Sequence, residues 1–206
     1  MIKLRPLLNE VVAGQTLINV DIQPEYEGSF SFRPDRWANF LNQNYGKVNH
    51  MVFLYNGKET LGMVSEDTYK YWLYDKGVSE EVVEGSTFYD KGYAFFRYCM
   101  DFGASEDAIA NFVRFMYDND IHDSRDMNRG MWAKYLREYR RSDKKEIMQL
   151  LRHQDDMIYI PDLMDFLKRF NGIVLTGGGI NECLKEVEIA LMALRKNYTV
   201  LHEFTY

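Results

Sequence analysis

Residues 173–184 read Ile-Val-Leu-Thr-Gly-Gly-Gly-Ile-Asn-Glu-Cys-Leu. The apolar residues predict a buried strand, the glycines predict a tight turn, and the cysteine opens a predicted helix. Glycines let backbone amides approach a ligand closely, and the positive end of a helix dipole favours a thiolate over a thiol. Cys183 is therefore the first candidate nucleophile in the chain.

The composition is that of a globular protein. The chain has 206 residues, of which 46% are hydrophobic and 15% aromatic, enough to bury a full core. Its net charge of -6, with acidic residues interleaved among Lys and Arg, argues against a nucleic-acid partner, because phosphate contact needs a basic face. Small uncharged or cationic ligands fit this charge balance better.

The cysteine and histidine content argues against a disulfide framework and a metal site. Cys99 and Cys183 are too few for a disulfide scaffold or a zinc knuckle. The histidines are scattered without metal-ligand spacing, at His50, His122, His153 and His202. The N-terminal sequence shows neither a signal peptide nor a long apolar run. We expect a cytoplasmic protein with free thiols, no membrane partner, no metal and no cofactor.

Short apolar runs alternate with segments of helical periodicity through most of the chain. Strands are predicted over residues 16–22, 50–55, 86–91, 172–177 and 198–204, and helices over 35–45, 65–76, 161–170 and 181–196. This alternation predicts an α/β fold in which a doubly wound parallel sheet is covered on both faces, giving three layers.

Between Ser105 and His153 the periodicity is helical only. We interpret residues 105–153 as a helical insertion in a single domain that spans residues 1–206. The insertion contains an acidic loop, residues 118–126, with His122 among four aspartates. Its spacing fits no calcium loop, so a solvated loop is the better interpretation than a metal cluster.

Polar residues with complementary chemistry follow three of the predicted strands. Asp21 and Lys91 come at strand ends, and Cys183 follows the glycine turn after a third strand. In parallel sheets ligands bind beyond the carboxyl ends of the strands, so these residues are expected to converge. The carboxylate can take the thiol proton and later return it to a leaving amine, while the ammonium stabilises negative charge. Backbone amides of the glycine turn can bind an oxyanion.

The segments around these residues resemble the motifs of isochorismatase-like cysteine hydrolases of the nicotinamidase and N-carbamoylsarcosine amidase type. Val20-Asp21-Ile22-Gln23 is similar to their Val-Asp-x-Gln motif, and Lys91-Gly-Tyr-Ala-Phe-Phe resembles their Lys-x-x-(Ser)-Ala-Phe segment. Residues 177–183 resemble their Gly-x-x-Thr-x-x-Cys turn. The motifs occur in the family's order, and the resemblance covers roughly the first 100 residues and the last 45.

The resemblance implies a catalytic triad of Asp21, Lys91 and Cys183. It also implies an oxyanion hole made by the amides of Gly179 and Cys183, and a cis peptide bond between Gly178 and Gly179. The candidate contacts to a small-molecule substrate are Gln23, Tyr26, Tyr93 and Phe95, with Phe30 as a further aromatic candidate.

The chain also departs from the family pattern. Metal-dependent nicotinamidases carry Asp-x-His after the second strand, where this chain has Tyr55-Asn56-Gly57, so a zinc or iron site and nicotinamidase activity are not expected. The helical insertion is additional. It is expected to form either a lid over the pocket or a dimer surface, which leaves a homo-oligomer possible.

Two classes of function follow from these observations. The first is a cysteine hydrolase that cleaves a small amide or related C–N bond through a thioester. The alternative is a descendant of the family that binds a small molecule without turnover and uses the insertion as a partner surface. Each of these residues also has an ordinary structural interpretation when it is considered alone. Cys183 would be an inert, partly buried side chain, Asp21 would cap a turn, and Lys91 would be a surface lysine. Cys99 is interpreted as a packing residue.

Overall fold

The computed structural model describes residues 12–58, 62–92, 104–139, 144–148 and 162–206. Contacts divide the chain into two compact units. The sheet unit comprises residues 1–93, 170–184 and 197–206, and the helical unit comprises residues 94–169 and 185–196. Each unit is described by itself.

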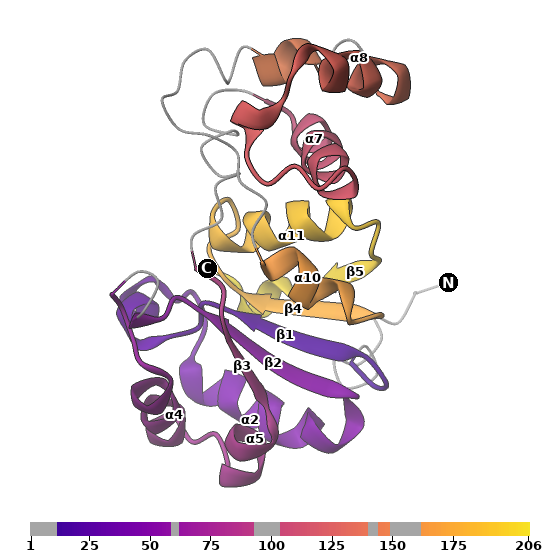
Figure 1. Ribbon diagram of the computed structural model, residues 1–206. Coiled ribbons are helices and arrows are strands. Elements are labelled where there is room, and N and C mark those ends of the chain that lie inside the picture. The colour runs from indigo at the N-terminus through magenta and orange to yellow at the C-terminus, as the bar shows by residue number, and fades with distance from the viewer. Residues whose placement is uncertain (1–11, 59–61, 93–103, 140–143, 149–161) are drawn as a thin grey trace. The chain divides into compact units, whose positions relative to one another are not determined.

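The sheet unit is built on five parallel strands in the order β3-β2-β1-β4-β5. The strands are β1 (Thr16–Val20), β2 (His50–Tyr55), β3 (Thr87–Asp90), β4 (Ile173–Gly177) and β5 (Tyr198–Val200). Every residue of β1 and β4 is buried, as expected where both faces of a parallel sheet are covered. The predicted parallel α/β class, with helices flanking the sheet, is confirmed (Figure 1).

The strand order reverses beside β1, which pairs with β2 on one side and with β4 on the other. Val20 is level with Leu54 of β2 and with Gly177 of β4, so these strands end at the same height. The residues that follow them therefore share one edge of the sheet at its topological switch point. This is where ligands bind in open α/β sheets.

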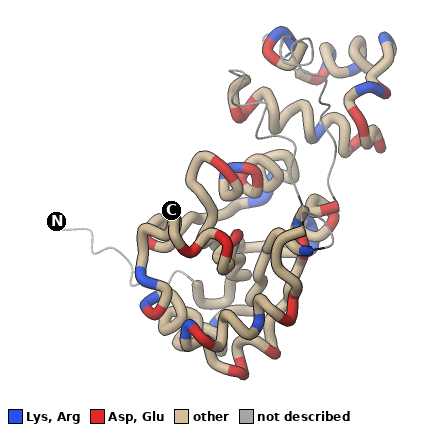
Figure 2. Tube along the Cα trace, turned by 90° about the vertical axis from the view of Figure 1, so that its left-hand side faces the viewer, with Lys and Arg blue, Asp and Glu red and all other residues tan. Residues whose placement is uncertain are grey.

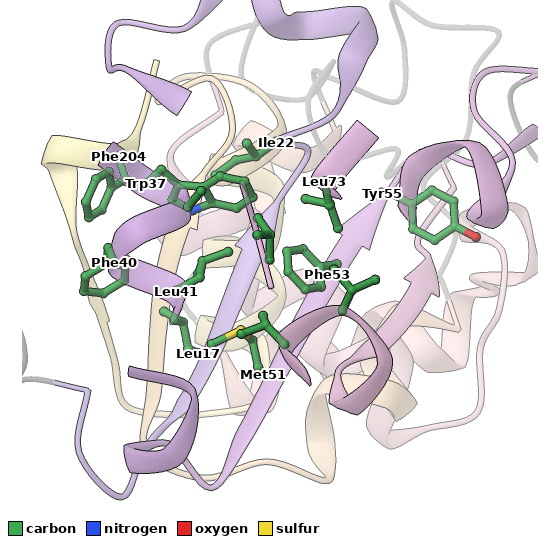
Figure 3. Packing of buried hydrophobic residues seen from close by; sticks show 14 of the residues in the cluster. Leu17, Ile22, Trp37, Phe40, Leu41, Met51, Phe53, Tyr55, Leu73 and Phe204 are labelled. Atoms are coloured by element: carbon green, nitrogen blue, oxygen red, sulfur yellow. The ribbon is translucent and has the colours of Figure 1, made fainter. Parts of the chain in front are cut away.

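Three helices of the sheet unit pack on the sheet through a large apolar cluster. They are α2 (Pro34–Asn44), α4 (Glu66–Asp75) and α5 (Glu80–Gly85). Trp37 of α2 meets Phe53 of β2 edge-on, with ring centroids 6.2 Å apart, and Tyr69 of α4 meets the same ring at 5.9 Å. Figure 3 shows Phe40 beside Phe204 at the margin of this cluster, with ring centroids 4.9 Å apart.

Three helix starts share the sequence Ser-Glu followed by a second acid, at Ser65, Ser79 and Ser105. In each case the serine hydroxyl accepts a hydrogen bond from the backbone N–H three residues later. The acids lie in the first turn, where the helix dipole favours negative charge. These caps fix where α4, α5 and α7 (Glu106–Asp118) begin.

A buried polar network crosses the centre of the sheet. The Asn19 side chain accepts hydrogen bonds from Trp37 Nε1 at 3.2 Å and from Thr176 Oγ1 at 2.7 Å, and it donates to Val52 O at 3.1 Å. Asn19 and Thr176 are both fully buried. One side chain of β1 thus binds β2, β4 and α2, which links the strand register to the position of the helix.

The helical unit contains α7, α8 (Arg129–Glu138), α10 (Leu163–Lys168) and most of α11 (Cys183–Ala193). Aromatic side chains join α7 to α8, with Phe112 stacked on Trp132 at a centroid distance of 5.5 Å. Arg114 Nε donates to the Ala193 carbonyl at 2.7 Å, at the C-terminal end of α11, where a cation is favoured.

Helices α7 and α8 lie within the predicted insertion, whereas the compact helical unit extends beyond residues 105–153 at both ends. Positive and negative residues are interspersed along both units (Figure 2). Among the described helices, none combines the length and the apolar character needed to cross a bilayer.

Some predicted boundaries were wrong. The last strand ends at Val200 rather than at Phe204, because residues His202–Phe204 turn into a 3-10 helix that buries Phe204. The elements that were not predicted include α5 and the 3-10 helix Pro24–Ser29. Both have six residues, too few for a helical period to show.

Candidate active site

Asp21 is the first residue beyond β1 and takes a left-handed backbone conformation with φ of 48°. Its N–H donates to Leu54 O at 2.8 Å, which keeps the residue against β2 after its own strand has ended. An aspartate tolerates this conformation better than most residues with a side chain. The turn leaves the carboxylate fully buried at the edge of the sheet.

Lys91 occupies the corresponding position after β3, where its N–H donates to Tyr55 O at 2.9 Å. Lys91 Nζ lies 2.9 Å from Asp21 Oδ2, and the two side chains are 3% and 0% exposed. Because β2 separates β1 from β3 in the sheet, this ion pair reaches across the end of one strand. The predicted association of Asp21 with Lys91 is confirmed.

The hydrogen bonding of the buried Asp21 carboxylate is incomplete in the described part of the chain. The Lys91 ammonium is within ion-pair distance, but neither carboxylate oxygen receives a well-directed hydrogen bond in the described part of the chain. Such an arrangement is uncommon for a buried carboxylate, since buried polar atoms are usually satisfied. It leaves lone pairs of Asp21 available to an acidic proton brought into the site.

The glycine turn after β4 requires glycine at two positions. Gly177 and Gly178 have φ of 78° and 67°. A Cβ at Gly177 would lie 2.2 Å from Val20 O, and one at Gly178 would lie 2.7 Å from Leu184 N. The turn therefore packs its backbone directly against β1 and the start of α11. Cys183, half-buried, is the first residue of α11, as the sequence predicted.

The expected cis peptide bond is not present. The described residues contain no cis peptide bond, so the Gly178–Gly179 bond is trans and this part of the prediction was wrong. The chain reverses direction through the left-handed conformations of Gly177 and Gly178 instead.

The turn presents one amide suited to an oxyanion. Gly179 is buried, and within the described residues its N–H donates to no acceptor. The peptide plane that carries this N–H is held by its other end, the Gly178 carbonyl, which accepts from Tyr206 N at 3.2 Å. The next peptide is held by the Gly179 carbonyl, which accepts from Glu182 N at 2.9 Å and from Leu184 N at 3.3 Å. A buried amide without an acceptor is rare in native proteins. The role of the Cys183 amide as the second donor stays a prediction.

The charges of Asp21 and Cys183 act on the same two tyrosines. Burial is the main cause that raises the pKa of Tyr206, followed by the negative charges of Asp21 and Cys183. Burial also raises the pKa of Tyr26, a hydrogen bond from Asn56 opposes this rise, and the same two charges add to it. Asp21, Cys183 and both tyrosines therefore belong to one electrostatic neighbourhood.

Tyr206 contacts both the residue that follows β1 and the glycine turn after β4. Its hydroxyl donates to Asp21 O at 3.0 Å. Its backbone N–H donates to Gly178 O at 3.2 Å, and its carbonyl accepts from Ile180 N at 2.9 Å. The Tyr206 ring lies 6.5 Å from the Tyr26 ring, measured between centroids. Tyr206 thus connects the end of β1 to the glycine turn and lies beside the rings of Tyr26 and Phe30.

The predicted substrate contacts have different outcomes. Tyr26 lies at the site, and Phe30 contacts Tyr206 with ring centroids 5.1 Å apart. Gln23 is fully buried, and its amide bonds to Glu25 Oε2 at 2.9 Å, a placement that favours a structural role over substrate contact. Tyr93 and Phe95 lie outside the described residues, as does Cys99.

Sequence reasoning missed Asn56 and Tyr206. Asn56 directly follows β2, so the strand-end rule that selected Asp21 and Lys91 also applies to it. It was considered only as a departure from a metal-binding motif. No sequence signal marks Tyr206, because its position depends on the path of the chain after β5.

Metal ligation finds no support in the described residues, which hold no group of three side chains suited to a metal ion. In the acidic loop of the helical unit, His122 Nε2 lies 3.1 Å from Asp120 Oδ1, and both side chains are largely exposed. This geometry favours the interpretation as a solvated loop.

No family model, no curated protein and no solved structure matches this chain. Fold and site together define a parallel α/β protein with a buried carboxylate and ammonium at the switch point and a cysteine at the adjoining helix start.

Proposed function

We propose that the protein is a cysteine-dependent hydrolase of small amides or related C–N compounds. The observation that carries this proposal is the buried Asp21–Lys91 ion pair at the switch point of the sheet, in the electrostatic neighbourhood of Cys183. A charged pair is costly to bury, so its position at a ligand-binding edge favours a chemical role over a purely structural one.

In the proposed reaction, Asp21 accepts the proton from Cys183 Sγ, and the sulfur attacks the substrate carbonyl carbon. The carbonyl electrons move to oxygen, and the resulting oxyanion is stabilised by the Gly179 amide and by the amide of Cys183. Collapse of this intermediate breaks the C–N bond, and the leaving nitrogen takes the proton from Asp21. Water then hydrolyses the thioester and regenerates the Cys183 thiol.

Lys91 has an electrostatic role in this scheme. Its ammonium lies 2.9 Å from Asp21 Oδ2 and compensates the negative charge buried there. Its positive charge also favours the thiolate over the thiol. Lys91 touches no reacting bond in this mechanism, so we assign it to the activation of Asp21 and Cys183.

The test is ammonia release from acetamide and benzamide, combined with mass spectrometry for an acyl group on Cys183. Cys183→Ala is expected to lose at least about 10³-fold in turnover with the fold retained, and Asp21→Asn a comparable amount. Because Asp21→Asn also leaves the Lys91 charge uncompensated, its circular dichroism spectrum at the assay temperature must match that of the wild-type protein. Cys99→Ser is the matched control and should keep its activity. Ammonia release that survives Cys183→Ala would overturn the proposal, and amide binding without any release would favour the non-catalytic alternative.

A further inference from the structure

Asn56 connects the Asp21–Lys91 ion pair to Tyr26. It is 3% exposed and directly follows β2. Lys91 Nζ donates to Asn56 Oδ1 at 3.1 Å, and Asn56 Nδ2 donates to the Tyr26 hydroxyl oxygen at 3.1 Å. The Asn56 N–H donates to Gln23 Oε1 at 2.8 Å, which fixes the backbone from which this side chain projects.

Donor and acceptor chemistry fixes the direction of these hydrogen bonds. An ammonium has only donors, so the Asn56 amide must turn its oxygen toward Lys91 and its NH₂ group toward Tyr26. The Tyr26 oxygen is then an acceptor for Asn56, and its single proton must point elsewhere. This assignment follows from the network around Lys91 rather than from hydrogen positions.

Within the described residues, the Tyr26 proton has only a weak partner. Its hydroxyl lies 3.3 Å from Met63 Sδ, a thioether that accepts hydrogen bonds poorly, and Met63 is 37% exposed. Burial of Tyr26 and the negative charges of Asp21 and Cys183 raise the pKa of its hydroxyl. Tyr26 therefore keeps its proton at neutral pH and can give it to a better acceptor than sulfur.

We propose that Tyr26 donates a hydrogen bond to an acceptor oxygen or nitrogen of the bound substrate, and that Asn56 is the positioning residue that orients this donor. The proposed substrates are thereby amides that carry a hydrogen-bond acceptor besides the reacting carbonyl. The recognition of substrate rests on the proposed hydrolase function. The direction of the Tyr26 hydroxyl is a property of the free protein and is tested separately.

The first experiment needs no substrate. Tyrosines labelled with ¹³C at Cζ are titrated by NMR, and Tyr26→Phe identifies the Tyr26 signal. Asn56→Leu is expected to raise the pKa of Tyr26, because a donor to its oxygen is lost. Asn56→Asp is expected to raise it further, because a carboxylate adds negative charge and turns the Tyr26 proton toward residue 56. A Tyr26 titration unchanged by both substitutions would overturn the assigned direction.

The second experiment measures the hydrolysis of isonicotinamide, whose ring nitrogen is an acceptor besides the reacting carbonyl, and of benzamide, which lacks that acceptor and should respond less to the substitutions. Tyr26→Phe is expected to raise KM for isonicotinamide about 3- to 10-fold, as for the loss of one hydrogen bond, and to leave kcat within about two-fold. Asn56→Asp should raise KM similarly, and the double variant should be no worse than either single one, because both remove the same donor. Tyr74→Phe, which removes a surface hydroxyl bonded to Glu84, is the matched control and should have no effect.

The outcomes separate the two proposals. Substrate recognition by Tyr26 would be overturned by an unchanged KM in Tyr26→Phe. It would also be overturned if the increases in KM of the two single variants multiplied in the double variant. In both cases hydrolysis could still depend on Cys183. A wild-type protein that releases no ammonia from either amide would count against the hydrolase, and the NMR titration would still decide the orientation of Tyr26.

Discussion

At the scale of single residues, the buried Asp21–Lys91 ion pair predicts how substitutions change the free energy of unfolding. Removing one member of a buried ion pair leaves the other charge without compensation. Lys91→Met is therefore expected to lower the free energy of unfolding by about 3–5 kcal/mol at neutral pH, as measured by urea denaturation. The double variant Asp21→Asn/Lys91→Met should lose less than Lys91→Met alone. A larger loss in the double variant would contradict an ion pair.

The glycine turn allows a second test at this scale. Gly177 and Gly14 both have positive φ, at 78° and 70°, but a Cβ at Gly14 meets nothing within 4 Å, whereas one at Gly177 meets Val20 O at 2.2 Å. Gly14→Ala should cost about 1–2 kcal/mol from backbone strain alone. Gly177→Ala should cost several kcal/mol more, because strand β1 must move. Equal costs in urea denaturation would show that the turn does not pack on β1 as described.

At the scale of elements, Asn19 links three of them. Asn19→Leu leaves Trp37 Nε1 and Thr176 Oγ1 buried without their acceptor, which is expected to cost about 3 kcal/mol of unfolding free energy. Asn49→Ala is the control, since its amide bonds Gly14 O at an exposed position. Its expected cost is below about 1 kcal/mol. A neutral Asn19→Leu variant would contradict the role of this network in the sheet.

The 3-10 helix Pro24–Ser29 carries Tyr26 and is anchored to α4 through Glu27. Glu27 accepts from Trp72 Nε1 at 3.0 Å and lies 2.8 Å from Lys76 Nζ. The hydrogen bond from Lys76, and after it the one from Trp72, lowers the pKa of Glu27 below its ordinary value of 4.5. The stabilisation by Glu27 is therefore complete above the pKa of the unfolded chain and is lost as the pH falls through the lowered pKa of the folded state.

Glu27→Gln tests this dependence by urea denaturation between neutral and acidic pH. The wild-type protein should be the more stable at neutral pH, and the difference should shrink on acidification, because the wild-type carboxyl becomes protonated. The expected difference is small, since the Glu27 side chain is 39% exposed. A difference that is constant with pH would contradict the ionic anchor.

The elements themselves were largely predictable from local sequence. Strands β1, β2 and β4 were found because each is a buried, largely apolar run bounded by turn residues. Helices α2 and α4 were found because their apolar residues recur at helical spacing. Elements of a few residues, such as α5, carry no such period. The conformation of the glycine turn was not predictable, since it depends on how closely Val20 approaches Gly177 in the folded sheet.

At the scale of the whole molecule, the site depends on strand order, which brings residues distant in sequence to one edge. Asp21 and Lys91 could be selected from the sequence because each follows a strand. Asn56 also follows a strand but was considered only as a departure from a metal-binding motif. Tyr206 was not selected, because its role arises from contacts that local patterns do not encode. Residues that enter the site through tertiary packing are therefore not found by selecting polar residues that follow strands.

The central claim is that the folded protein activates Cys183. Its most direct test is the rate of Cys183 alkylation by iodoacetamide at pH 7 in a Cys99→Ser background, comparing the native protein with the same protein unfolded in urea. The native thiol should react several times faster than the unfolded one, and Lys91→Met should slow it, because the neighbouring ammonium favours the thiolate. A native Cys183 that reacts no faster than the unfolded cysteine, and that does not respond to Lys91→Met, would contradict the account.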